Sequence, residues 1–168
     1  MKVRFILLFV CCAFFPIGLK AQTVPTFTKN TVDGSFDTPE TAYPADLDGD
    51  GDLDIIVTSL YGGATYSGGI SWYKSSGGMN PTFTKISIDD TTKYPRDVEV
   101  IDLDNDGDLD IISANSIDGS STVDNIFWYE NNGGATQTFT RSTVGMVLGT
   151  AANVEIADLD GDDDLDII

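Results

Sequence analysis

The chain reads DLDGDGDLDII at residues 46–56, and the pattern returns as DLDNDGDLDII at residues 102–112 and as DLDGDDDLDII at residues 158–168. The three stretches begin at positions 46, 102 and 158, which are equally spaced (102 − 46 equals 158 − 102). Each run of alternating aspartates leads directly into a pair of isoleucines. A carboxylate cluster that feeds an apolar strand is the pattern expected of a calcium loop in a β-hairpin.

The repeat is wider than the aspartate loops. An FTK or FTR triplet, an aromatic WY segment and a Gly-Gly pair recur at the same interval (27–29, 83–85 and 139–141; 70–73 and 126–129; 77–78 and 133–134). Such a period is typical of solenoids, propellers and arrays, and about 56 residues suits one four-stranded propeller blade. We predict repeats at about residues 27–82, 83–138 and 139–168, the last of them incomplete.

Hydrophobic alternation predicts four strands in the second repeat, at residues 98–102, 109–114, 126–130 and 136–144. No segment keeps a helical period, so the predicted fold class is all-β, with propeller blades of four antiparallel strands. Residues 26–32 match the fourth strand of a further unit. The region after residue 21 holds about 2.6 repeats, whereas a closed propeller needs at least about four blades. We therefore expect a partial propeller that belongs to a longer protein.

Residues 1–21 are predicted to be a secretory signal peptide, which leaves the repeat region at residues 22–168. Lys2 and Arg4 precede an apolar run at residues 5–15, and a small residue, Ala21, stands before the expected cut. The apolar run is too short for a membrane span of about 20 residues. Cleavage would remove both cysteines, and a secreted chain without disulfides needs another stabiliser such as a metal. We expect a secreted or cell-surface protein with no membrane insertion after cleavage.

The charge of the chain is strongly negative. It has 27 acidic and 9 basic residues, and 16 of the acids lie in the three loops. Such crowded carboxylates are costly unless cations neutralise them. The acidity argues against nucleic acid or an anionic membrane surface as a partner. The absence of histidine excludes a Ser-His-Asp triad and a histidine-ligated zinc site within this sequence.

The alternating aspartates are the predicted metal ligands, because calcium takes six to eight oxygen ligands from carboxylates and carbonyls. They are Asp46, Asp48, Asp50, Asp52 and Asp54 in loop 1 (residues 46–54), Asp102, Asp104, Asp106, Asp108 and Asp110 in loop 2 (residues 102–110), and Asp158, Asp160, Asp162, Asp164 and Asp166 in loop 3 (residues 158–166). In each loop the first three side chains would converge, the fourth aspartate would offer its carbonyl with its side chain outward, and the fifth would return as the last carboxylate. The cofactor expected is Ca²⁺.

The turn residues differ among the loops. Gly51 can adopt the positive φ that a sharp turn needs, and Asn105 enters this region more easily than most residues. Asp163 replaces the corresponding glycine in loop 3, so we expect this loop to bind most weakly. An EF-hand is excluded, because it requires a glutamate at the twelfth position, where Val57 and Ser113 stand, and flanking helices. Solvated acidic turns without metal are the remaining alternative, which three copies with identical spacing disfavour.

These loops, entering Ile-Ile strands and followed by Trp-Tyr and Gly-Gly, resemble the FG-GAP or VCBS-type repeats of the integrin α-subunit propeller and of many secreted bacterial proteins. The resemblance covers about residues 25–168. It implies a β-propeller, often seven-bladed, with calcium in hairpin loops on one face. It also implies a role in ligand binding or adhesion, with polysaccharides or extracellular proteins as ligands.

We expect a binding module and no enzyme. One alternative is the non-catalytic propeller region of a larger secreted enzyme, such as a polysaccharide-degrading one; another is a propeller that is itself catalytic, as in some calcium-dependent polysaccharide lyases. Two acid pairs lie outside the loops (Asp89 with Asp90, Asp97 with Glu99), but their spacing selects no reacting pair. Trp72 and Trp128 keep strict places in the repeat, which favours packing in the blade core over stacking on sugars.

Overall fold

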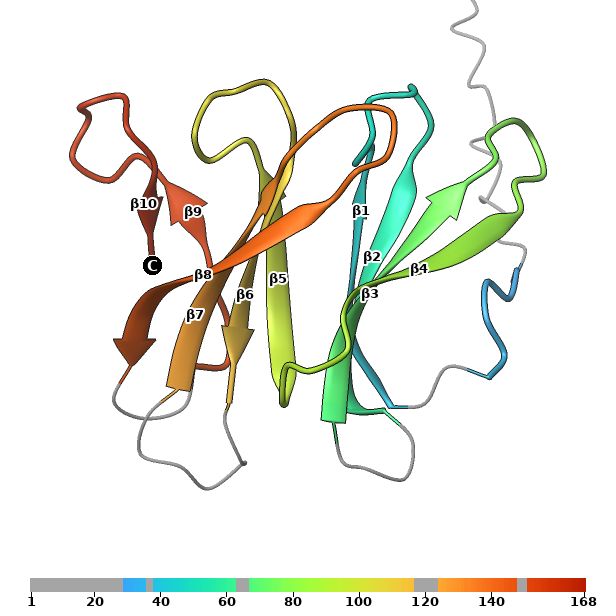
Figure 1. Cartoon of the computed structure of the whole chain (residues 1–168), viewed down its shortest axis with the longest axis horizontal. Coiled ribbons are helices and arrows are strands. Elements are labelled where there is room, and N and C mark those ends of the chain that lie inside the picture. The colour runs from blue at the N-terminus through green and yellow to red at the C-terminus, as the bar shows by residue number, and fades with distance from the viewer. Residues whose placement is uncertain (1–28, 36–37, 63–66, 117–123, 148–150) are drawn as a thin grey trace, which may run out of the picture. The chain divides into compact units, whose positions relative to one another are not determined.

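The computed structural model describes residues 29–35, 38–62, 67–116, 124–147 and 151–168 (Figure 1). The predicted signal peptide lies outside these residues. The described residues form ten strands and no helix, which confirms the predicted all-β class. Residues 29–32, the described part of the segment predicted as an additional fourth strand, form no strand.

Eight strands form two four-stranded antiparallel sheets, each with its strands in chain order. Blade 1 consists of β1 (Pro39–Ala45), β2 (Asp54–Gly62), β3 (Ser67–Ser75) and β4 (Phe83–Asp89). Blade 2 consists of β5 (Pro95–Ile101), β6 (Asp110–Asn115), β7 (Asp124–Asn131) and β8 (Phe139–Val147). A third hairpin pairs β9 (Ile156–Ala157) with β10 (Asp166–Ile167). This up-and-down order is that of propeller blades.

The two blades share one register. Ile56 lies opposite Trp72 in blade 1, and Ile112 lies opposite Trp128 in blade 2. Successive residues of a strand point to opposite faces, so each Ile-Ile pair supplies one isoleucine to each face of its sheet. All six residues of β6 are buried, as expected for a strand covered on both faces.

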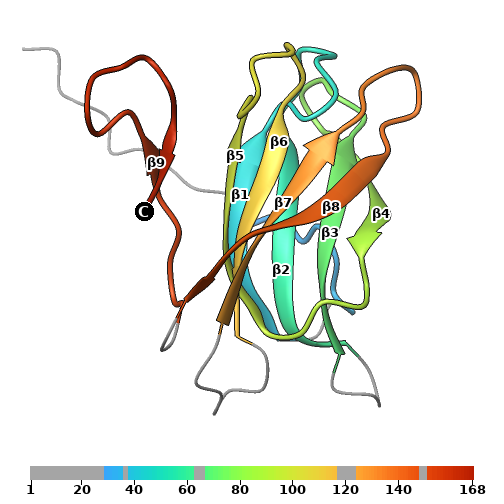
Figure 2. The ribbon, with the colours of Figure 1, turned by 60° about the vertical axis from the view of Figure 1, so that its left-hand side comes forward.

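One face of blade 1 packs against blade 2, and β5 lies beside β1 and β2 (Figure 2). The shared core contains Ile56, Ile70 and Trp72 from blade 1 and Val98, Ile111 and Tyr129 from blade 2, each at most 3% exposed. This burial confirms the predicted core role of Trp72. The second face of blade 2 forms another core, in which Ile112, Ala114 and Ile126 meet Ala151 and Val154, with Trp128 packed against them.

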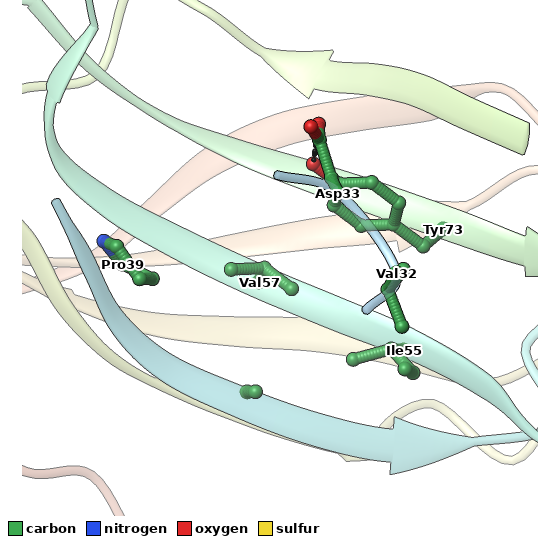
Figure 3. Close-up of a pocket in the computed structure, with 7 residues that line it drawn as sticks. Val32, Asp33, Pro39, Ile55, Val57 and Tyr73 are labelled. Carbon is green, nitrogen blue, oxygen red and sulfur yellow. Dashed lines mark hydrogen bonds between the residues drawn. The ribbon is translucent and has the colours of Figure 1, made fainter. Parts of the chain in front are cut away.

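The second face of blade 1 carries an apolar groove (Figure 3). Its lining residues are Val32, Asp33, Pro39, Ala42, Ile55, Val57 and Tyr73. One repeat later, the equivalents of Ile55 and Tyr73 are Ile111 and Tyr129, which blade 1 covers. Ile111 is fully buried, whereas Ile55 is only half-buried. The groove therefore lies on the face of blade 1 that is equivalent to the face of blade 2 packed against blade 1.

Candidate metal centre

Each aspartate loop joins the first strand of its sheet to the second. Loop 1 lies between β1 and β2, loop 2 between β5 and β6, and loop 3 between β9 and β10 (Figure 1). These strands are antiparallel neighbours, so the loops are hairpin turns at one end of their sheets. This is the position predicted from the Ile-Ile pairs that follow the loops.

Three carboxylates converge in every loop, with one oxygen of each within 4.8 Å of the others. The sets are Asp46, Asp48 and Asp50 in loop 1, Asp102, Asp104 and Asp106 in loop 2, and Asp158, Asp160 and Asp166 in loop 3. A donor set made only of oxygen suits a hard divalent cation such as Ca²⁺ or Mg²⁺.

The first aspartate of each loop orders the turn through two backbone hydrogen bonds. In loop 1 the N–H of Asp50 donates to Asp46 Oδ1 (3.0 Å), and the N–H of Gly51 donates to Asp46 Oδ2 (2.9 Å). The same two bonds form to Asp102 in loop 2 and to Asp158 in loop 3, at 3.0–3.2 Å. The loops are thus shaped by their own carboxylates, and the spacing of aspartates serves folding as well as any metal.

Positive φ values occur at the predicted turn positions. Gly51 has φ 91°, Asn105 has φ 60° and Asp163 has φ 71°. Side chains with a Cβ rarely adopt this region, so Asp163 carries a conformational cost that glycine at the same position in loops 1 and 2 avoids. Loops 2 and 3 therefore each hold one non-glycine residue at positive φ, Asn105 and Asp163, whereas both such positions in loop 1 are glycines.

The fifth aspartate of loop 1 lies beneath the loop rather than on its surface. Asp54 is fully buried. It accepts hydrogen bonds from Ser75 N–H (2.7 Å), Trp72 Nε1 (2.8 Å) and Leu47 N–H (3.3 Å). Burial raises the pKa of Asp54, and these donors offset only part of the increase. The carboxylate joins the loop to β3, a role that the alternating spacing did not reveal.

Asp110 has the same place in loop 2. It is fully buried and accepts hydrogen bonds from Asn131 N–H (2.8 Å) and Leu103 N–H (3.2 Å). Burial also raises its pKa. In loop 3, Asp166 accepts from Leu159 N–H (3.0 Å) and lies within the converging set. Coordination of a metal ion by Asp54 and Asp110 remains a prediction, whereas the structure shows their hydrogen bonds to backbone N–H groups.

The fourth aspartate packs against the repeated glycine pair. Gly77 has φ 69°, and a Cβ there would collide with the carboxylate of Asp52. Gly133, with φ 65°, stands in the same relation to Asp108. The space over each glycine is thus occupied by a loop side chain. This contact explains why the glycine pair keeps the interval of the repeat; sequence reasoning had assigned it only a turn.

Loop 1 contains a buried carboxylate with an unused acceptor. The Asp48 side chain is 5% exposed, and its Oδ1 has no hydrogen-bond partner. A buried polar atom without a partner is costly. A cation held by Asp46, Asp48 and Asp50 would supply the missing interaction, so the residues present fit a divalent metal ion.

A family model described as FG-GAP-like repeat matches residues 46–113 and again residues 102–168. Each match begins at the first aspartate of a loop, and together they cover more than half of the chain. The chain belongs to the FG-GAP-like repeat family. This confirms the resemblance inferred from the loops. No curated protein was found to match the chain.

Membership in the FG-GAP-like family indicates a propeller-like ligand-binding or adhesion module. FG-GAP repeats often bind divalent cations, in keeping with the three acidic clusters, and they occur in extracellular or surface proteins. No helix in the described part of the chain has the length and apolar character needed to cross a membrane.

One acid of each pair outside the FG-GAP loops has structural partners. Asp89, at the end of β4, accepts hydrogen bonds from Tyr129 (3.0 Å) and Arg141 (2.7 Å) of blade 2 and from Thr91 (2.7 Å). Burial alone would raise the pKa of Asp89, but the bonds from Thr91 and Tyr129 and the Arg141 guanidinium outweigh it and hold the pKa below its ordinary value. Asp97 accepts from Val154 N–H (3.2 Å).

The Asp89–Tyr129 bond is itself part of the repeat. Tyr73 donates to Asp33 at 2.8 Å, and both of these residues stand one repeat interval earlier in the chain. Ser35 holds Asp33 as Thr91 holds Asp89, and its hydrogen bonds lower the pKa of Asp33 to about 2. The hydrogen bond from Tyr129 to Asp89 joins blade 2 to blade 1. Sequence reasoning missed it, although both aspartates and both tyrosines keep the common interval.

Proposed function

We propose that the chain is a calcium-binding β-propeller module of a secreted or cell-surface protein, and that it binds a polysaccharide or an extracellular protein without catalysing a reaction. The observation that carries the calcium assignment is the triplicate convergence of carboxylates, with the unpartnered buried oxygen of Asp48 in loop 1. The family match supports the binding role.

Calcium is favoured over magnesium on the chemistry of the donors. Ca²⁺ accepts six to eight oxygen ligands in flexible geometry, whereas Mg²⁺ demands a near-ideal octahedron and keeps several waters. Each loop offers three convergent carboxylates, and backbone carbonyls of the same loop would complete the coordination in this proposal. In loop 1, Asp46, Asp48 and Asp50 would hold the ion, and in loop 2 Asp102, Asp104 and Asp106 would do so.

Bound calcium would neutralise the crowded loop carboxylates, and the chain would couple this to the blades through its own hydrogen bonds. Asp54 joins loop 1 to Ser75 and Trp72 on β3, so an ordered loop fixes the position of the central strands. An ion that binds only the folded state stabilises it by about 2.7 kcal/mol when its concentration is 100 times Kd. Calcium has a structural role in this proposal, and the ligand surface lies elsewhere on the module.

A binding role is favoured over catalysis by the partners of two acids outside the loops, one from each acid pair. Asp89 is engaged by Tyr129 and Arg141, and Asp97 by Val154 N–H. These contacts account for the positions of both carboxylates without a reaction.

The test is a calorimetric calcium titration combined with thermal melts with and without chelator. About three sites and a calcium-dependent rise in Tm are expected. Asp104→Asn/Asp106→Asn should remove one site, whereas Asp90→Asn, a similar change at an exposed acid outside the loops, should remove none. A folded protein that binds no calcium, or that loses no site in the double variant, would refute the assignment.

A further inference from the structure

A lysine side chain lies against the carboxylates of loop 1. Lys74, on β3, forms an ion pair with Asp48, and its Nζ lies 3.4 Å from Asp50 Oδ2. The ammonium also lies over the indole of Trp72, 5.7 Å from the ring centroid, which favours this position through a cation–π interaction. Lys74 therefore contacts two of the three convergent carboxylates of loop 1, and its single positive charge offsets one of their negative charges.

Loop 2 has the opposite charge at the equivalent position. Lys74 lies opposite Thr84 on β4, and Glu130 lies opposite Thr140 on β8, one repeat later in both strands. Among the residues that the structure describes, no lysine or arginine forms an ion pair with an aspartate of loop 2. The repeat thus places a positive charge beside one calcium loop and a negative charge at the same strand position beside the next.

We infer that Lys74 competes with calcium for loop 1 and that the two loops fill in order, loop 2 before loop 1. The inference rests on the proposed function. Calcium ligated by Asp48 and Asp50 would lie a few ångströms from an ammonium that pairs with the same two carboxylates, so the two cations repel each other and the ammonium must leave. Its flexible four-carbon stem allows that movement. Glu130 adds a negative charge on the side of loop 2, which favours a cation there.

Replacement of Lys74 by calcium in loop 1 also makes the two blades differ in stability when calcium is scarce. Lys74 neutralises part of loop 1 without an ion, so blade 1 keeps its loop compensated at low calcium. Loop 2 has no such substitute among the described residues and depends more strongly on the ion. Lys74 is therefore an affinity-determining residue of loop 1, and Glu130 is its counterpart for loop 2.

The two tryptophans of the chain provide separate reporters. Trp72 Nε1 donates to Asp54 beneath loop 1, and Trp128 occupies the same register position in blade 2, beside loop 2. Their indole N–H resonances can be followed by ¹⁵N NMR during a calcium titration of the protein and assigned with Trp128→Phe. In the wild type, the Trp128 resonance should reach its midpoint at lower calcium than the Trp72 resonance.

Lys74→Met should lower the calcium midpoint of Trp72 about tenfold and leave that of Trp128 unchanged, because one unit charge a few ångströms from the ion is removed under partial screening. Glu130→Lys should raise the Trp128 midpoint about tenfold. Lys93→Met is the matched control: the charge change is the same, but Lys93 is exposed between β4 and β5, at the strand ends opposite the loops. It should move neither midpoint more than about twofold.

Equal midpoints in the wild type, or a Lys74→Met protein that titrates like Lys93→Met, would overturn the inference while leaving calcium binding intact. Indole resonances of a folded protein that do not respond to calcium in any variant would overturn the proposed function as well. The two failures are thus distinguishable in one titration series.

Discussion

Replacing Asp54 with alanine would remove the acceptor that three N–H groups share beneath loop 1. The donors are Ser75 N–H at 2.7 Å, Trp72 Nε1 at 2.8 Å and Leu47 N–H at 3.3 Å, and the carboxylate that receives them is fully buried. Asp110 offers a matched control in blade 2, because it is equally buried but accepts only the two bonds from Asn131 and Leu103 that its geometry shows.

The expected magnitude follows from the number of donors. A hydrogen bond to a charged group contributes about 1.5–3 kcal/mol, and a buried donor left without a partner costs about 1–3 kcal/mol. Part of this is offset, since the variant no longer buries a carboxylate whose pKa burial has raised. We expect Asp54→Ala to lower the free energy of unfolding by about 4 kcal/mol and Asp110→Ala by about 3 kcal/mol. Asp54→Asn, which keeps one acceptor oxygen, should cost about 2 kcal/mol.

The assay is urea unfolding at pH 7, monitored by circular dichroism in excess chelator, so that loss of a bound ion does not contribute. A loss of less than about 1 kcal/mol for Asp54→Ala would refute the structural role of its hydrogen bonds. If the loss arose only when calcium was present, Asp54 would act as a metal ligand alone. Should the alanine variant prove too unstable to measure, the graded loss in Asp54→Asn keeps the comparison with Asp110→Asn open.

Three further outcomes are expected. Gly77→Ala should destabilise the protein by about 2 kcal/mol and Gly78→Ala by about 1 kcal/mol, because both glycines have positive φ but only a Cβ at position 77 meets Asp52; equal losses in urea unfolding would contradict that contact. Asp163→Gly should raise the free energy of unfolding by about 0.5–1 kcal/mol by relieving φ 71°, and an unchanged or lower Tm would speak against strain in loop 3. The pKa values of Asp33 (about 2) and Asp89 are depressed in the folded state, so the stabilisation that these carboxylates provide is present above their unfolded pKa of about 4 and is lost as pH falls through the folded values. The free energy of unfolding of Asp89→Asn should therefore decline less steeply than that of the wild type below about pH 4. Parallel curves would exclude the hydrogen bonds of Asp89 as a source of acid sensitivity.

Local patterns predicted the blades well because the relevant signals lie within a few residues of one another. The Ile-Ile pair marks a strand buried on both faces, and the aspartate loop marks the turn before it. Strand ends were less exact. The strand predicted at residues 98–102 is Pro95–Ile101, with a register shift between Pro95 and Asp97, and the strand predicted at residues 136–144 is Phe139–Val147. Irregular pairing at such ends depends on the neighbouring strand, which alternation within one segment does not report.

The contacts that sequence reasoning missed join residues from different strands or blades. Asp52 faces Gly77 across a hairpin, and Tyr129 reaches Asp89 between blades. Their recurrence at the interval of the repeat was a usable signal, but only the fold shows which repeated residues meet. The change from Lys74 to Glu130 breaks the repeat, and its meaning also depends on the position of the loop.

The packing between the blades joins two different surfaces. Blade 1 presents Ile56 and Trp72, and blade 2 receives them with Ile111 and Tyr129. Such a contact is heterologous: it relates each unit to the next by one rotation, and repetition of that rotation produces a ring when the rotations close and an open array when they do not. The number of blades in an assembly of these repeats is thus set by the rotation angle between neighbouring blades, which the packing of the whole contact determines.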